Sequence, residues 1–99
     1  MTPAPPAPFE HETGEITVRL WAAAKAAAGI DHVTITTVAP LALSEVVERV
    51  LAGRPERLAE VLAGCAVLVG DRPVTTQDPA EVEVRPGENV EFLPPFAGG

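Results

Sequence analysis

The residues best suited to chemistry in this sequence stand at its end, Ala97-Gly98-Gly99. Their side chains have almost no volume, so a main-chain carboxylate at this position can enter a narrow channel that a branched residue would block. A free carboxylate is a poor electrophile in water, and it becomes reactive once a partner converts it into an acyl-phosphate anhydride with ATP and magnesium. We therefore expect Gly99, with Gly98 beside it, to be the reactive site. The alternative is a chain end without function.

The residues before the glycines are of types that can present such an end to a partner. Pro94-Pro95 is a stiff pair, because proline fixes φ, and it directs the following residues away from the preceding strand. Phe96 offers one large apolar anchor. This arrangement predicts that the chain brings the carboxylate while a partner brings ATP and magnesium, so the chain itself binds no cofactor.

Other catalytic patterns are missing from the sequence. It contains no His beside a Ser or Cys in a motif, no phosphate-binding glycine loop and no metal-ligand spacing, so we predict no metal site. His11 and His32 are expected to be solvated, and Cys65 is expected to be a buried, inert thiol. Three carboxylates are expected on the solvent face of strands: Glu81, Glu83 and Glu91.

Composition bounds the fold and the partners. The 99 residues suffice for one small domain, and with 46% hydrophobic but only 4% aromatic residues its core must consist of Val, Leu, Ile and Ala, with Phe92 and Trp21 as large exceptions. The formal charge of −7 opposes binding to nucleic acid or to anionic membranes. A single cysteine, and a start without a basic segment or an apolar run, favour the cytoplasm.

Hydrophobic periodicity divides the chain into a Pro-rich disordered tail over residues 1–15 and one domain over 16–99. Strands and helices are predicted from alternation and from helical stripes, respectively. The strands are 16–20, 33–38, 66–69, 82–85 and 89–93, and the helices are 21–28, 44–52 and 58–63. Whether the first two strands form a hairpin stays open. The order predicts an α+β fold with one mixed sheet covered by helices on a single face.

The C-terminal pattern resembles that of a known family. Leu93-Pro94-Pro95-Phe96-Ala97-Gly98-Gly99, preceded by Pro86-Gly87-Glu88-Asn89-Val90, is similar to the end of the ubiquitin-like sulfur carriers of the ThiS/MoaD family. The stretch Val18 to Lys25, followed by Ala28-Gly29, looks like the first strand and helix of its molybdopterin branch. The resemblance implies a β-grasp (ubiquitin-like) fold with parallel first and last strands at its centre and an exposed Gly-Gly tail.

The resemblance also implies a function. Gly99 would be adenylated by an E1-like enzyme, converted to a thiocarboxylate with sulfur from a donor protein, and inserted into the large subunit of molybdopterin synthase for molybdenum cofactor biosynthesis. Such a chain is a carrier or sulfur-donating subunit, not a self-sufficient catalyst. The segment from Phe92 to Ala97, comprising Phe92, Leu93, Pro94, Pro95, Phe96 and Ala97, would be held by the partners.

Some residues depart from the family pattern. Trp21 stands where a smaller aromatic is usual, and Ala42 replaces an expected Thr cap of the second helix, so Ser44 is the predicted cap. The loop from Asp71 to Glu81 is long. Three alternatives therefore stay open: a sulfur carrier for thiamine, cysteine or thiosugar synthesis, a ubiquitin-like modifier joined to lysines through Gly99, and a binding module whose sheet pairs with a partner.

Overall fold

The computed structural model of the chain describes residues 14–95, so the predictions for residues 1–13 and 96–99 lie outside the described residues. Along the chain, strands and short helices alternate. In order they are β1 (Gly14–Leu20), α1 (Ala22–Ala28), β2 (His32–Thr37), β3 (Leu41–Ala42), α2 (Leu43–Leu51), α3 (Arg57–Ala63), β4 (Ala66–Val69), β5 (Arg72–Pro73), the 3-10 turn η2 (Pro79–Glu81), β6 (Glu83–Val84) and β7 (Asn89–Leu93).

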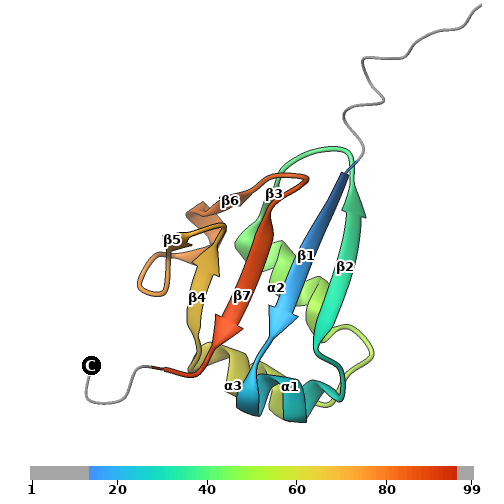
Figure 1. Ribbon diagram of the computed structural model, residues 1–99, viewed down its shortest axis with the longest axis vertical. Helices are drawn as coiled ribbons and strands as arrows, with labels where there is room; N and C mark the ends of the chain where they lie inside the picture. Colours follow the sequence, from blue (N-terminus) through green and yellow to red (C-terminus); the bar gives the residue numbers. More distant parts are fainter. Residues whose placement is uncertain (1–13, 96–99) are drawn as a thin grey trace, which may run out of the picture.

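Five of the strands form one mixed sheet in the order β2-β1-β7-β4-β5 (Figure 1). The first and last long strands, β1 and β7, pair in parallel at its centre, with Val18 opposite Val90. β2 pairs antiparallel with β1, with Ile16 opposite Ile35, so the first two strands form a hairpin whose connection contains α1. The parallel central pair and the helical covering confirm the predicted α+β class.

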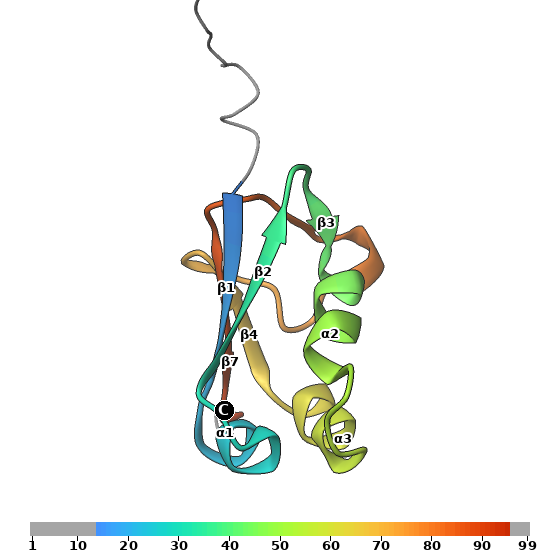
Figure 2. The same cartoon turned by 90° about the vertical axis from the view of Figure 1, so that its right-hand side faces the viewer.

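The helices cover one face of this sheet, as the view in Figure 2 shows. Alternate strand residues, among them Ile16, Val18 and Val90, point to that face and are fully buried against α2 and α3. Apolar side chains from both helices close the core, because their i, i+3 and i+4 positions form a single stripe. The buried residues of α2 and α3 are Leu43, Val46, Val50, Leu58 and Leu62.

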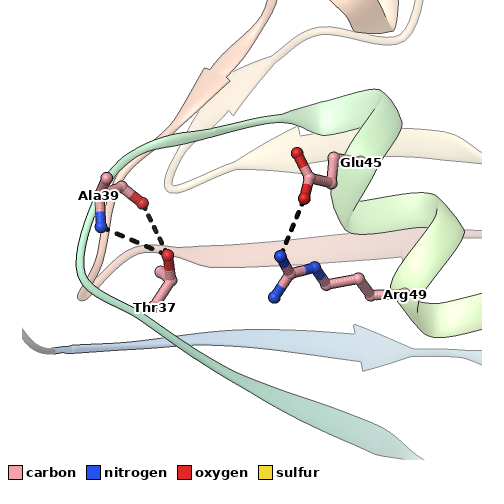
Figure 3. Close-up of polar contacts among 4 residues, drawn as sticks. All are labelled: Thr37, Ala39, Glu45 and Arg49. Atoms are coloured by element: carbon pink, nitrogen blue, oxygen red, sulfur yellow. Dashed lines mark hydrogen bonds and ion pairs between the residues drawn. The ribbon is translucent and has the colours of Figure 1, made fainter.

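A second, two-stranded sheet lies at the end of the molecule opposite α1. β3 pairs with β6 there, and the loop that leads from β2 into β3 is closed by Thr37, whose hydroxyl donates to the Ala39 carbonyl at 2.9 Å (Figure 3). On the exposed side of α2, Arg49 donates to Glu45 at 2.8 Å, an i,i+4 pair worth about 0.2–0.5 kcal/mol. The strand predicted over 82–85 contains β6, so it belongs to the two-stranded sheet and not to the main one.

Three predictions of detail are corrected. α2 begins at Leu43 with Ala42 as its N-cap and no side-chain cap; the Leu43 amide instead donates to the Val82 carbonyl at 2.8 Å, so Ser44 lies inside the first turn. β1 begins at Gly14, two residues before the predicted boundary, because its pairing with β2 extends to Thr37. Trp21 is 41% exposed and is not a core residue.

Candidate functional site

The last strand determines where the chain leaves the fold. β7 is paired on both sides, in parallel with β1 and antiparallel with β4. Its final pairs are Phe92 with Leu20 and Leu93 with Ala66, and the Phe92 carbonyl accepts a hydrogen bond from the Trp21 amide at 3.2 Å. The chain therefore leaves the sheet at Pro94, at the end of the sheet beside α1 and α3 (Figure 1).

The structure separates the residues of the predicted partner segment. Phe92 is only 2% exposed and packs in the core with Val90, so it anchors β7 and offers no contact surface to a partner. Leu93, on the opposite face of the strand, is half-buried, and Pro94 and Pro95 are exposed. The remaining predicted residues, Phe96, Ala97, Gly98 and Gly99, lie outside the described residues.

An exposed tryptophan at the exit is a feature that the sequence reasoning missed. The Trp21 indole Nε1 donates to Glu91 Oε1 at 3.2 Å, and the Arg19 guanidinium lies 5.5 Å from the centre of the Trp21 ring, within cation–π range. Both contacts fix the ring against the sheet face that the helices leave open. The alternation of β1 could have predicted this: Ile16, Val18 and Leu20 face the core, so odd-numbered residues continue on the other side.

Apolar side chains accompany the tryptophan on this open face. Leu93 lies beside Ala66 on β4, and Leu68 lies opposite Glu91, so half-buried leucines from β4 and β7 occupy the same face as Trp21 near the exit. We name Trp21, Leu68 and Leu93 the exit patch. Together with the flanking Arg19 and Glu91 it combines an apolar centre with charged neighbours, the composition of a protein-contact surface.

A hydrogen-bonded His–Asp pair lies where α1 connects to β2. His32 Nδ1 and Asp31 Oδ1 are 2.8 Å apart, and both side chains are exposed. The hydrogen bond with His32 lowers the pKa of the Asp31 carboxyl; the charges of His32 and Lys25 act in the same direction, and desolvation opposes them. The exposed pair matches the predicted solvated histidine.

Cys65 lies between α3 and β4. Its thiol is 7% exposed and donates to the Val61 carbonyl at 3.3 Å. Burial raises the pKa of the Cys65 thiol, so little thiolate forms at neutral pH. This environment agrees with the predicted buried, inert thiol.

The part of the chain that the structure describes holds no group of three or more His, Cys, Asp or Glu side chains arranged to bind a metal ion. None of its helices is long and apolar enough to cross a membrane. At the exit, the described residues provide a fixed point of departure at Pro94 and, beside it, the exit patch with its charged neighbours Arg19 and Glu91.

Solved structures with the same fold support the resemblance. The HVO 2177 protein of Haloferax volcanii matches with a TM-score of 0.68 and 23% identity over 89% of each chain. The small archaeal modifier protein 1 from Methanosarcina acetivorans matches with a TM-score of 0.66 and 18% identity, covering 88% of this chain and 98% of that one. A chain in the complex of subunits 1 and 2 of the molybdopterin-converting factor from Helicobacter pylori matches with a TM-score of 0.55 and 25% identity, covering 86% and 99%.

No protein-family model and no curated protein sequence matches the chain. The structural matches confirm the predicted ubiquitin-like β-grasp fold. The match to the chain from the molybdopterin-converting factor also supports the resemblance to the ThiS/MoaD type.

Proposed function

We propose that the chain is a sulfur carrier that uses the Gly99 carboxylate as its reactive group. In the proposed cycle an E1-like enzyme supplies ATP and Mg²⁺; a carboxylate oxygen attacks the α-phosphorus, and pyrophosphate leaves. A donor protein then supplies sulfur at the oxidation level of sulfide; this sulfur attacks the carbonyl carbon, AMP leaves with its phosphate oxygen, and a thiocarboxylate forms. The observation that carries the proposal is the central parallel β1–β7 pair, which leads the chain out of the sheet at Pro94, five residues before Gly99.

The exit patch supports the proposal from the side of the partner. An activating enzyme must hold the carrier while it acts on the carboxylate, and Trp21, Leu68 and Leu93 form an apolar surface near the exit. Positioning a reacting group in this way is worth several orders of magnitude in rate. We therefore propose that the enzyme contacts the exit patch and draws in the tail beyond it.

For the acceptor, we propose molybdopterin synthesis as the first candidate, with the chain as the small subunit of a hetero-oligomeric synthase. The support is the match to a chain in the two-subunit molybdopterin-converting factor complex, which covers nearly all of that chain. Co-purification with a large subunit from the same cell, followed by conversion of a pterin precursor, would test this assignment. Sulfur transfer to a thiamine, cysteine or thiosugar precursor instead would redirect it.

The experiment for the carrier reaction is intact-protein mass spectrometry after incubation with ATP, Mg²⁺, the activating enzyme and a sulfur donor. The expected product is heavier by the difference between sulfur and oxygen. Deletion of Gly99, or one alanine appended after it, should abolish the mass change without altering the fold. An unmodified wild-type carboxylate under these conditions would contradict the proposal.

Matched variants test the contact surface separately. Leu93→Ser alters the exit patch, and Val38→Ser alters an exposed apolar residue just after β2, at the opposite end of the sheet. We expect the first to raise KM for the carrier in the adenylation reaction and the second to leave it unchanged. Equal KM values for the two variants would remove the exit patch from the proposal but leave the carboxylate chemistry in place.

A second candidate, protein modification through Gly99, is favoured by the match to an archaeal modifier protein. It predicts conjugates of higher mass in cells that survive reducing agents. Lys25 is the single lysine of the chain and is exposed on α1, so chains of this protein linked through lysine could form only there. Lys25→Arg should abolish such chains while leaving sulfur carriage intact.

A further inference from the structure

An apolar groove lies immediately beside the point where the chain leaves the sheet. It has a volume of about 320 Å³ and opens between α1 and α3, which pack side by side below the sheet (Figure 2). We name it the exit groove. Its walls are Trp21, Ala22, Ala23 and Ala24 from the first helix and the residue before it, Glu60, Val61, Gly64 and Cys65 from the α3 side, and Pro94 and Pro95.

The sequence explains why a groove forms here. α1 carries alanines where it faces α3, and Gly64 ends α3, so short side chains leave a depression between larger walls at Trp21 and Val61. Glu60 is the one charged residue among the groove's described walls. Such a surface favours an apolar group and disfavours a carboxylate.

We propose that the exit groove is a seat for the aromatic ring of Phe96. Pro95 forms part of the groove wall, and consecutive Cα atoms lie about 3.8 Å apart, so Phe96 begins at the rim. The fixed φ angles of Pro94 and Pro95 limit the conformations that must be lost for the ring to enter. Phe96 is the only large apolar side chain among the four residues that follow Pro95, and Ala97, Gly98 and Gly99 offer no competing group.

The seat holds the terminal glycines near the ends of α1 and α3. A partner that binds at the exit would meet the exposed indole of Trp21 and the Pro94-Pro95 pair. The seat itself does not depend on what Gly99 carries. Only its bearing on how an activating enzyme reaches the tail rests on the proposed carrier function.

Nuclear Overhauser contacts in the full-length protein test the seat directly. We expect contacts between the Phe96 ring protons and the Val61 methyl groups. They should disappear in Phe96→Ala and persist in Phe9→Ala, which changes the aromatic residue near the other end of the sequence. Absence of the Phe96 contacts in the wild-type protein, or contacts from Phe9 instead, would overturn the proposal without requiring any variant to fold.

A pair of matched variants on α1 gives a second test. Ala23 lines the groove, whereas Ala26 is exposed on the same helix and is not part of its wall. Ala23→Gln should displace the ring, lower the heteronuclear NOE of Gly98 and Gly99, and shift the fluorescence of Trp21 to the red. Because the chain has one Trp and no Tyr, the emission reports on the surroundings of Trp21 alone. Ala26→Gln should change neither signal; equal effects of both variants would overturn the seat.

The seat and the carrier function fail separately. Phe96–Val61 contacts in a protein whose carboxylate never gains sulfur would support the seat and contradict the proposed function. A protein that gains sulfur but lacks these contacts, and whose Trp21 spectrum is unaffected by Ala23→Gln, would support the carrier function and contradict the seat.

Discussion

Replacing Phe92 tests whether this residue anchors β7 in the core or contacts a partner, because only the first role predicts a large loss of stability. Phe92 lies on β7, and its side chain is 2% exposed in the hydrophobic core. Phe92→Ala removes this buried ring and should cost about 3–5 kcal/mol of unfolding free energy. A domain of this size is stable by only about 5–15 kcal/mol, so this variant should lose a large part of its stability. Phe92→Leu keeps the site apolar and should cost about 1 kcal/mol, lowering the Tm by about 4–8 °C.

Urea denaturation followed by Trp21 fluorescence and by circular dichroism measures these differences. Leu93→Ala is the matched control, because Leu93 is the next residue, lies on the opposite face and is only half-buried. Its cost should be about 1 kcal/mol, since only part of a leucine side chain is removed from contact. If Phe92→Ala unfolded at the same urea concentration as the wild type, the inward orientation of Phe92 and the core assigned here would be refuted.

Three further predictions concern the exit end of the fold. Ala22 has φ 51°, a left-handed conformation that costs a non-glycine residue about 1–2 kcal/mol, so Ala22→Gly should be neutral or stabilising in urea denaturation, whereas Ala23→Gly should destabilise by up to about 1 kcal/mol. His32→Gln should raise the pKa of Asp31 in an NMR titration; because the folded pKa is lowered, the stabilisation is present above the unfolded pKa and is lost as the pH falls through the folded value. Cys65 should react with iodoacetamide far more slowly in the native protein than in urea at the same pH, and equal rates would contradict its burial and raised pKa.

Strands with a clear alternation were predictable from the sequence. β7 spans Asn89–Leu93 as predicted, and the turn before it contains Gly87 at a φ of 97°, a conformation that favours glycine. α1 ends before Gly29, which adopts the left-handed conformation that favours glycine at a helix end. In each case a local preference and the tertiary structure point to the same conformation.

Other features depend on contacts that a local pattern does not contain. β3 and β6 are two residues each, too short for any periodicity, and they exist because they pair with each other. That pairing also places the Val82 carbonyl at the Leu43 amide, which is why the α2 terminus needs no side-chain cap. The exposure of Trp21 follows from the alternation along β1, in which even-numbered residues face the core and odd-numbered residues face the other side. The sequence contained this signal, but the expectation that a large aromatic residue belongs in a small core outweighed it.

The topology explains why the end of the chain, rather than a pocket, is the feature to test. β7 is hydrogen-bonded along both edges by β1 and β4, so releasing it would require disrupting the centre of the sheet. The point of departure at Pro94 is therefore as stable as the domain. For the proposed carrier, this rigid base limits the positions in which a partner must search for the Gly99 carboxylate, and the small side chains of Ala97, Gly98 and Gly99 suit a narrow channel.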